Sequence, residues 1–375
     1  MEIKIINLAF KVKKPILALG AHAKNTVCFV QGKFAHLSPI LQNLNQPDDF
    51  LRFEKTVRLF LKNKPRIIAY DLHPEYQSAK YALDLSPSAY HLSPIQHHHA
   101  HIASCMADNQ LKNQSVIGVA FDGTGLGSDN RIWGAEFLLC DYNNFQRRAH
   151  LKEIPLLGGE SAISEPWRLT AAWLYQIYKD KFLDLSLSFL KSIGKNKWRV
   201  LKKMYASGLN SPLASSMGRL FDAAAVLTLG KTKAKFEAEL AMELEKSASG
   251  YQSQSTAGYN FSILKTKDGY IIDPANIFQG IIADLKNKES KAKMAWRFHF
   301  AIAQMIHKTC LILRRDSGLN KVVLSGGVFQ NKLLLRLALV LLYKDGFTVF
   351  THRQLSCNDS CVSLGQALIA GHSKG

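Results

Sequence analysis

The chain of 375 residues has no long apolar run, no closely paired cysteine motif and no dinucleotide-binding glycine fingerprint. No stretch reaches the roughly 20 apolar residues that span a bilayer, so we expect no membrane segment. The N-terminus lacks the apolar core and cleavage site of a signal peptide. The six cysteines include no C-x-x-C pair, which argues against a zinc ribbon and fits free thiols in a reducing, cytoplasmic compartment.

Acidic residues are scarce beside basic ones, 29 against 48, which gives a formal net charge of +19. Such an excess suits contact with RNA or with an acidic protein. The lysines are spread over many segments and are not interleaved with aromatic residues, which favours a general solubility bias over a nucleic-acid footprint. We therefore expect no nucleic-acid partner, while an acidic protein partner stays open.

The length exceeds what one hydrophobic core usually serves and predicts more than one lobe. Strand and hairpin patterns followed by helical ones begin each half of the chain, which favours two related α/β lobes. We assign residues 1–112 to the first lobe, with a C-terminal helix of about residues 362–375 packing back on it. Residues 113–361 form the second lobe, with a helical insert of about residues 160–250.

A few segments carry clear secondary-structure patterns. Residues 15–19 and 26–31 predict a hairpin, and the continuous apolar run over residues 116–121 predicts a strand covered on both faces. Residues 166–230 are expected to be mostly helical, and residues 289–315 predict one long amphipathic helix.

Four histidines lie within residues 97–101, which read His-His-His-Ala-His at the start of a predicted helix. His97 and His101 are four residues apart, so a helix places both imidazoles on one face. Two neutral imidazoles directed at one point make a first-row metal site the main expectation.

Two carboxylates are candidates to complete such a site. Asp122 ends the apolar strand and begins Asp-Gly-Thr-Gly-Leu-Gly, where it can reach a metal while the glycine amides approach a phosphate. The alternative is a tight hairpin turn. Asp359 precedes the last helix, and a set of two histidines and two carboxylates suits Fe(II), zinc or manganese. Taken alone, Asp359 is better explained as an N-cap of the helix from Val362, because aspartate is common at that position.

Other polar residues occupy loop and helix-start positions. Gly326, Gly327 and Asn331 lie between a buried strand and a helix, where phosphate binding and a simple glycine-capped loop are both open. Arg168 suits a phosphate or carboxylate, or a surface ion pair. Asp222 suits ribose hydroxyls, or only the dipole of its helix.

The chain closely resembles the C-terminal transferase region of the hydrogenase-maturation carbamoyltransferase family HypF, from about residue 15 to the end. Its motifs occur in the same order along the chain, and so many ordered motifs make the match specific. They are DLHPEY (71–76), QHHHAH (96–101), FDGTG (121–125), GG (158–159), EPWR (165–168), SSMGRLFD (215–222), SGGVFQN (325–331), ND (358–359) and SLGQ (363–366).

The resemblance implies a two-lobed, actin-like or sugar-kinase-like (ASKHA) α/β fold. Each lobe is a mixed sheet flanked by helices, and a nucleotide and a divalent metal, iron or zinc, lie in the cleft. It also implies a role for each of fourteen residues. The metal ligands are His97, His101, Asp122 and Asp359; the residues beside the phosphates are Gly123, Thr124, Gly125, Gly127, Gly326, Gly327 and Asn331; Asp222 lies beside the ribose; and Lys24 and Arg168 face the cleft as catalytic residues.

In that family a carbamoyl group passes from carbamoyl-adenylate to the C-terminal cysteine of the partner HypE, as a step toward the cyanide ligand of the hydrogenase centre. The resemblance thus implies a HypE-like acceptor and an adenine nucleotide, as carbamoyl-AMP, ATP, ADP or AMP. A metal can polarise the carbamoyl or phosphate oxygen, and loop amides can stabilise the AMP leaving group.

The sequence departs from the family pattern in three ways. The upstream acylphosphatase-like, zinc-finger and adenylate-forming regions have no counterpart in these residues, so we expect the transfer half only, with a separate protein forming the adenylate. Two family glycines after the Asn-Asp pair are Ser360 and Cys361 here. A third family glycine, which faces the nucleotide, is Ala238.

Three other functions stay open from the sequence. Antibiotic O-carbamoyltransferases share the metal set. The tRNA threonylcarbamoyl-transfer family is related and would use the positive charge, although it lacks an aspartate like Asp122 and has a different histidine motif. The Ser360–Cys361 and Ala238 departures fit a degenerate nucleotide-binding partner without activity.

Overall fold

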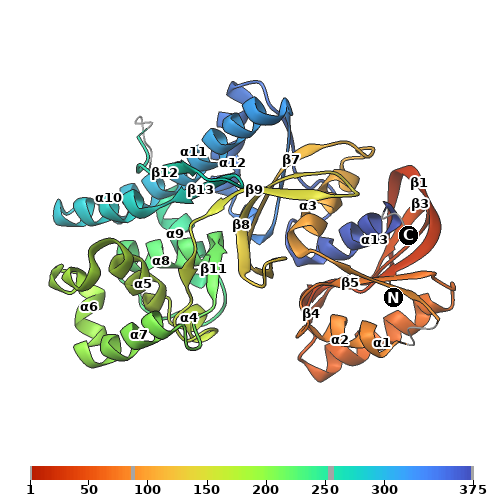
Figure 1. Cartoon of the computed structure of the whole chain (residues 1–375), viewed down its shortest axis with the longest axis horizontal. Helices are drawn as coiled ribbons and strands as arrows, with labels where there is room; N and C mark the ends of the chain where they lie inside the picture. The colour runs from red at the N-terminus through yellow and green to blue at the C-terminus, as the bar shows by residue number, and fades with distance from the viewer. Residues whose placement is uncertain (1, 86–88, 252–256, 373–375) are drawn as a thin grey trace.

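The strands of the computed structural model form two main sheets with helices packed on them (Figure 1). The structure describes residues 2–85, 89–251 and 257–372. One sheet has four strands in the order β3-β1-β5-β6, and the other has nine strands. No helix among the described residues is long and apolar enough to cross a bilayer.

The four-stranded sheet is built from the first quarter of the chain. β1 pairs antiparallel with β3, and β5 lies parallel to both β1 and β6. The hairpin predicted from residues 15–19 and 26–31 is confirmed, with Ala18 opposite Cys28, and β1 is longer than expected. The elements here are β1 (Lys4–Ala18), β2 (Ala23–Asn25), β3 (Cys28–Leu37), β4 (Leu41–Asn43), α1 (Pro47–Leu61), β5 (Ile67–Asp71), α2 (Gln77–Asp84), β6 (His91–Ile95) and α3 (His97–Asp108).

In the nine-stranded sheet β7 lies between β8 and β14, and its residues 116–121 are buried throughout, as their continuous apolar run predicted. β7 pairs antiparallel with β8 and parallel with β14. The strands are β7 (Val116–Leu126), β8 (Ile132–Cys140), β9 (Phe145–Leu151), β10 (Ile154–Pro155), β11 (Leu213–Ser216), β12 (Ser262–Lys265), β13 (Tyr270–Asp273), β14 (Lys321–Ser325) and β15 (Thr348–Phe350).

Helices make up most of the chain between β10 and β14. The expected helical stretch of residues 166–230 is interrupted by β11, and α10 was not predicted. These helices, with the short ones after β14, are α4 (Ser161–Ser164), α5 (Trp167–Tyr178), η1 (Lys179–Asp184), α6 (Ser188–Ile193), α7 (Lys195–Ser207), α8 (Met217–Leu229), α9 (Glu239–Ser249), α10 (Ala275–Lys286), α11 (Lys291–Ser317), η2 (Gly327–Gln330), α12 (Lys332–Lys344), η3 (Asp359–Cys361) and α13 (Val362–His372).

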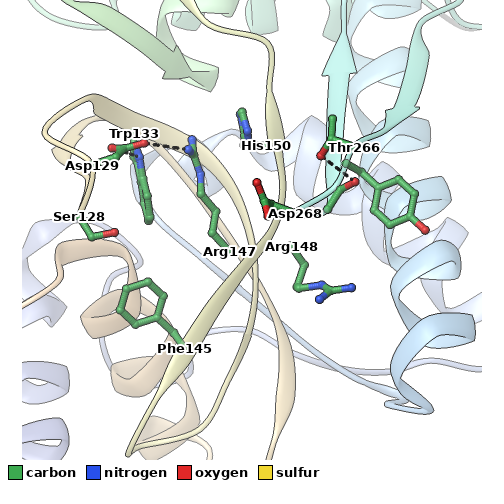
Figure 2. Close-up of a pocket in the computed structure, with 11 residues that line it drawn as sticks. Ser128, Asp129, Trp133, Phe145, Arg147, Arg148, His150, Thr266 and Asp268 are labelled. Carbon is green, nitrogen blue, oxygen red and sulfur yellow. Dashed lines mark hydrogen bonds and ion pairs between the residues drawn. The ribbon is translucent and has the colours of Figure 1, made fainter.

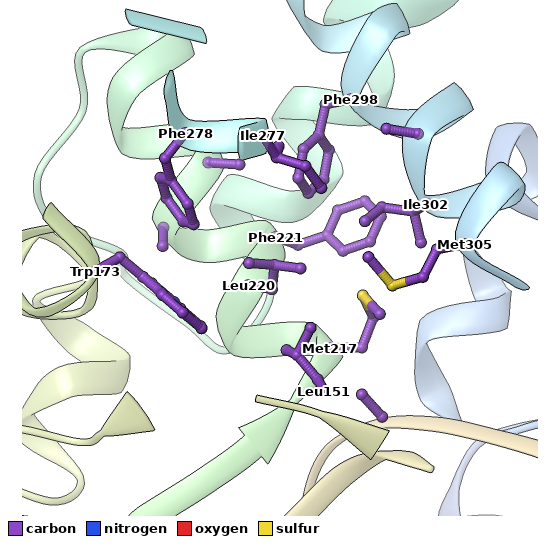
Figure 3. Close-up of a cluster of buried hydrophobic side chains, with 14 of the residues drawn as sticks. Leu151, Trp173, Met217, Leu220, Phe221, Ile277, Phe278, Phe298, Ile302 and Met305 are labelled. Atoms are coloured by element: carbon purple, nitrogen blue, oxygen red, sulfur yellow. The ribbon is translucent and has the colours of Figure 1, made fainter. Parts of the chain in front are cut away.

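Aromatic side chains fill the core between α5, α8, α10 and α11 (Figure 3). Trp173 stacks on Phe278 with ring centroids 5.5 Å apart, and Phe221 meets Phe298 edge-on at 4.9 Å. All four rings are buried. Such aromatic pairs contribute about 0.5–1.5 kcal/mol beyond the area they bury. This packing fixes α8, whose first turn lies beside Asp122.

The last helix returns to the first sheet. α13 packs against α3 and β1, and Figure 1 shows it beside β1 and β3. Gly365 allows the approach, because a Cβ there would lie 1.8 Å from the carbonyl oxygen of Ala100 in α3. The lobe boundaries expected from the sequence, residues 1–112 and 113–361, stay a prediction.

Candidate metal centre and its surroundings

The histidine cluster occupies the first turns of α3, as its spacing predicted. Gln96 caps this helix, since its side-chain oxygen accepts the backbone N–H of His99 at 2.8 Å. β6 delivers the chain to this cap from the edge of the first sheet. The rings of His97 and His101 lie on one face of α3, with centroids 4.9 Å apart.

Four side chains from three distant segments converge here: His97, His101, Asp122 and Asp359. One ligand atom from each lies within 4.8 Å of all the others. The Nε2 atom of His101 is 3.0 Å from Asp122 Oδ2 and 3.5 Å from Asp359 Oδ1. The Nε2 atom of His97 is 3.7 Å and 3.8 Å from the same two oxygens. The structure thus brings together the four residues that the sequence singled out as a set.

Local structure aims both carboxylates at the histidines. The strand pairing of β7 with β8 is interrupted between Phe121 and Gly125, so Asp122 leaves the regular ladder. Asp122 Oδ1 accepts the N–H of Gly123 at 2.7 Å, which leaves Oδ2 for the histidines. Asn358, and not Asp359, caps the turn η3 that leads into α13. The N-cap alternative for Asp359 concerned the helix from Val362, and it stays a prediction.

Asp122 and the two histidines of the cluster shift one another's pKa values toward their charged forms. Burial opposes protonation of His97, but Asp71 and Asp122 raise its pKa to about 10. Burial also opposes charge on His101, whose pKa is nevertheless raised well above its usual value by Cys361, Asp122 and Asp359. Burial would raise the pKa of Asp122, yet the facing imidazoles of His101 and His97 hold that pKa well below the ordinary range.

The cluster fits a metal ion on the evidence of its own atoms. The Nε2 atoms of His97 and His101 and Oδ2 of Asp122 are buried without hydrogen-bond partners. Buried polar atoms in that state are costly unless something binds them. Ligands about 2.1 Å from a tetrahedral zinc ion lie about 3.4 Å from one another, close to the spacings here. Imidazole and carboxylate donors suit zinc and iron alike.

Asp71 orients His97, a role that the sequence did not assign. Its Oδ2 lies 2.7 Å from Nδ1 of His97, and both side chains are fully buried. A carboxylate on the far nitrogen fixes the tautomer and ring orientation of a metal-binding histidine. The available signal was the position of Asp71 at the carboxyl end of a buried strand.

The two intervening histidines face away from the cluster. His98 Nδ1 lies 3.1 Å from the Gln96 amide, and His99 Nε2 donates to the carbonyl oxygen of Asp141 at 2.6 Å. Burial lowers the pKa of His99 to about 4. Only half of the four histidines therefore reach the candidate site.

The glycine segment after Asp122 continues β7 instead of forming the tight turn considered as an alternative. The turn comes later, where Gly127 N–H bonds the carbonyl oxygen of Arg131 at 2.8 Å. Gly125 allows the histidines to approach, because a Cβ there would lie 2.6 Å from His98. A Cβ on Gly127 would lie 2.1 Å from Trp133 Nε1. Thr124 is half-buried beside them.

The second glycine loop adjoins the same carboxylate. Gly326 has a φ of 104°, and a Cβ there would lie 2.2 Å from the carbonyl oxygen of Phe121. A Cβ on Gly327 would lie 3.0 Å from Asp122 Oδ1. Asn331 caps α12 by accepting the N–H of Leu334 at 2.8 Å, and its Nδ2 lies 2.9 Å from His299 Nε2.

Asp222 lies in α8 with a buried arginine that the sequence analysis did not single out. Asp222 Oδ2 is 3.1 Å from Arg219 Nε, and both side chains are at most 3% exposed. Burial raises the pKa of Asp222, against the opposing charge of Arg219. The Nη2 atom of Arg219 is 3.6 Å from Glu237, whose carboxylate lies over Gly123. Arg219 is thus a cation buried beside the glycine segment.

The two expected catalytic cations are not part of the cluster in the described contacts. Lys24 is exposed in β2 with a φ of 48°. Arg168 donates to Glu165 at 2.5 and 2.8 Å, which matches the ion-pair alternative. No described side-chain contact joins either cation to the four converging side chains, although β2, which carries Lys24, packs against η3, which carries Asp359.

A cavity of about 470 Å³ lies next to the loop that follows β7 (Figure 2). Trp133, Arg147 and His150 line it from β8 and β9, as Figure 2 shows. Arg147 is held over the Trp133 ring at 4.2 Å and bonds the buried Glu136 at 2.6 Å. Its charge is therefore already paired.

Comparison with known proteins gives consistent matches. Residues 118–366 match the family model described as "Carbamoyltransferase, Kae1-like Domain, second subdomain", and residues 11–108 match "HypF Kae1-like domain". The chain is 32% identical to carbamoyltransferase HypF2 of Cupriavidus necator, over 95% of this chain and 46% of that protein. It is also 32% identical to a HypF homolog of the same organism, over 95% of this chain and 91% of that protein.

A solved structure extends the likeness to the fold. A crystal structure of full-length HypF in the phosphate- and nucleotide-bound form superimposes with a TM-score of 0.91, at 37% identity. The match covers 98% of this chain and 47% of that chain. The α/β fold class expected from the sequence is confirmed by these matches. The chain spans about half the length of the first curated relatives it matches.

Proposed function

Because the chain belongs to the carbamoyltransferase HypF family, we propose that it transfers a carbamoyl group from carbamoyl-adenylate to a thiol of an acceptor protein in hydrogenase maturation. The acceptor is the C-terminal cysteine of a HypE-like protein. The observation that carries the proposal is the convergence of His97, His101, Asp122 and Asp359 within 4.8 Å. A cytoplasmic location, as expected from the sequence, stays a prediction.

These four residues would hold a divalent iron or zinc ion. When bound, such an ion supplies Lewis-acid polarisation of a substrate oxygen. Asp71 keeps His97 in the tautomer that presents Nε2, through its 2.7 Å contact with Nδ1. Burial of both histidines and of Asp122 keeps bulk water from these atoms.

The remaining residues of the site bind and orient the adenylate. Backbone amides of the Gly123–Gly127 and Gly326–Gly327 segments face the phosphate, where they stabilise charge on the departing group. Asp222 receives the ribose hydroxyls. In transfer, the acceptor sulfur bonds the carbamoyl carbon, the bond from that carbon to the adenylate oxygen breaks, AMP leaves, and the thiol proton passes to solvent.

We assign to residues 1–375 the transfer step, and not the formation of the adenylate. The chain matches only 46–48% of the length of the first two curated relatives, which hold further residues outside this match. The nucleotide- and phosphate-bound state of the solved HypF structure supports a nucleotide as the carrier.

The test supplies the purified protein with ferrous or zinc ion, pre-made carbamoyl-adenylate and a purified HypE-like acceptor. Mass spectrometry of the acceptor is expected to show one added carbamoyl group. The His101→Ala variant is expected to lose both the bound metal and the transfer, because one of four ligands is removed from a buried site.

The matched control is His91→Ala, a change at an exposed histidine six residues before the cluster. It is expected to keep metal and transfer. ATP with carbamoyl phosphate in place of the adenylate is expected to give no product. Full retention of metal by His101→Ala contradicts the ligand assignment. Turnover with ATP and carbamoyl phosphate contradicts the proposal that these residues carry out the transfer step alone.

A further inference from the structure

The two histidines of the cluster differ in what supports them from behind. His97 has the Asp71 carboxylate on its Nδ1. His101 has no carboxylate on Nδ1 among the described contacts. Its neighbours there are the hydroxyl of Ser325 at 3.3 Å and the sulfur of Cys361 at 3.4 Å. Asp71 fixes the ring of His97 through Nδ1, and the group that does the same for His101 has to be found among its other neighbours.

The Ser325 hydroxyl leads to a second histidine and then to a carboxylate. Ser325 Oγ is 2.9 Å from His352 Nε2. On the other side of that ring, His352 Nδ1 is 3.4 Å from Asp108 Oδ2. The side chains of His352 and Asp108 are 4% and 0% exposed, and Ser325 is fully buried. These contacts form a continuous line from His101 to a carboxylate.

Asp108 also fixes the segment that carries His352. It is the last residue of α3, the helix that begins with His97. Its Oδ2 accepts backbone N–H groups of Arg353 at 2.7 Å, Gln354 at 3.0 Å and Leu355 at 3.2 Å. The C-terminal end of α3 therefore positions the loop that carries His352, and this loop contacts the line that leads to His101 in the first turns of the same helix.

The donors and acceptors of these groups allow hydrogens to be donated in one consistent direction, from His101 toward Asp108. A histidine that binds through Nε2 carries its proton on Nδ1 and donates it. Ser325 Oγ can accept that proton while its own hydroxyl hydrogen is donated to His352 Nε2. His352 then carries its proton on Nδ1, which faces Asp108. The first two donors of the line meet acceptors within hydrogen-bond distance, and Nδ1 of His352 faces the Asp108 carboxylate at 3.4 Å without forming a hydrogen bond to it.

We propose that Ser325, His352 and Asp108 form a buried relay that fixes the tautomer and orientation of His101, as Asp71 does directly for His97. All three are positioning residues, since they act through His101. Cys361 Sγ is a second neighbour of the same nitrogen at 3.4 Å, beside the Ser325 hydroxyl, and is not part of the proposed line. The inference rests on the proposed metal site and adds the residues that prepare it.

The experiment measures zinc affinity by competition with a chelator for the whole chain and its variants. Ser325→Ala and His352→Gln are each expected to weaken zinc binding about 10- to 100-fold, the usual effect of removing an outer partner of a metal-bound histidine. Asp71→Asn is expected to give a loss of the same order through His97.

A double variant separates a relay from two independent packing effects. When groups act in series, removing either one abolishes the whole effect. The double variant Ser325→Ala, His352→Gln is therefore expected to bind zinc no more weakly than the single variant with the lower zinc affinity. The matched control is Ser104→Ala, which removes another buried hydroxyl of the same region, in α3, whose Oγ has no hydrogen-bond partner. It is expected to change zinc affinity less than twofold.

Thermal unfolding of the metal-free variants provides a readout independent of binding. Unchanged metal-free melting with weakened zinc binding supports the relay. Wild-type affinity in Ser325→Ala and His352→Gln overturns it while leaving the metal site intact, and so do losses that multiply in the double variant. A wild-type chain that binds no zinc or ferrous ion overturns the metal site itself, and the relay with it.

Discussion

At the scale of single residues, the neighbours of a histidine decide its chemistry. His97 and His101 face carboxylates and have raised pKa values. His99 faces a backbone carbonyl and has a lowered one. Sequence spacing identified the first pair, because helical periodicity is local. It did not identify Asp71, Arg219 or Ser325, since each reaches the site through contacts between distant segments.

His299 gives a pH-dependent prediction outside the cluster. It is fully buried in α11, and burial lowers its pKa to about 4. The unfolded chain, with a histidine pKa near 6.5, takes up a proton as the pH falls while the folded chain does not. Folding stability is therefore lost on acidification below about pH 6.5, by about 2 kcal/mol at pH 5.

Urea unfolding at pH 7.5 and pH 5 checks this prediction. His299→Gln is expected to lose about 2 kcal/mol less between the two pH values than the wild-type chain. His91→Gln, a change at an exposed position, is expected to keep the wild-type difference. Equal pH sensitivity of the wild-type and His299→Gln chains argues against a buried neutral imidazole.

At the scale of elements, residues with strong periodicity were predicted well. The apolar run that became β7 and the long amphipathic pattern that became α11 (Lys291–Ser317) both indicated their elements. α10 was missed because it contains Gly280 and several isoleucines, which are poor helix formers. Tertiary packing stabilises α10 as a helix, and the packing is close: a Cβ on Gly280 would lie 2.5 Å from the Tyr259 ring.

The beginning of α9 provides an element-scale prediction. Ala238 precedes the helix with a φ of 65°, in the left-handed region that favours glycine. The glycine that the family pattern carries here is therefore explained by backbone geometry. Ala238→Gly is expected to stabilise the fold by about 1 kcal/mol, as measured by urea unfolding.

The control for that change lies three residues later. Ala241→Gly, inside α9, is expected to destabilise the chain by about 1 kcal/mol, because glycine is unfavourable in a helix interior. Destabilisation by both substitutions would contradict the left-handed conformation of Ala238.

At the scale of the whole molecule, the end of the chain is bound to its beginning. Gln366 in α13 accepts the N–H of Gly20 at 2.9 Å and donates to the carbonyl oxygen of the same residue at 3.2 Å. Thr26 meets Ser363 at 2.6 Å. The sequence predicted the helix, but only the three-dimensional fold reveals these contacts.

Gly365 tests the importance of this closure for the candidate site. Gly365→Ala is expected to force α13 away from α3, since the new Cβ would lie 1.8 Å from the Ala100 carbonyl oxygen. We expect a loss of about 3 kcal/mol in unfolding free energy, together with weaker zinc binding, because α3 carries two of the four proposed ligands.

Gly371→Ala on the same helix is the milder comparison. Its Cβ would meet the Ile16 side chain at 3.0 Å, and a side chain can rotate away where a backbone carbonyl cannot. Its effect on stability and zinc affinity is expected to be small. Equal effects of the two substitutions would contradict the role of the α3–α13 contact.

The dispersal of the four converging side chains along the chain sets the order of events during biosynthesis. His97 and His101 emerge from the ribosome long before Asp359, and α13 must follow before the turn beside Asp359 can dock. A nascent polypeptide thus carries an incomplete set of donors until Asp359 has been synthesised. Binding of the proposed ion by all four side chains therefore requires that the segment with Asp359 has already docked beside α3.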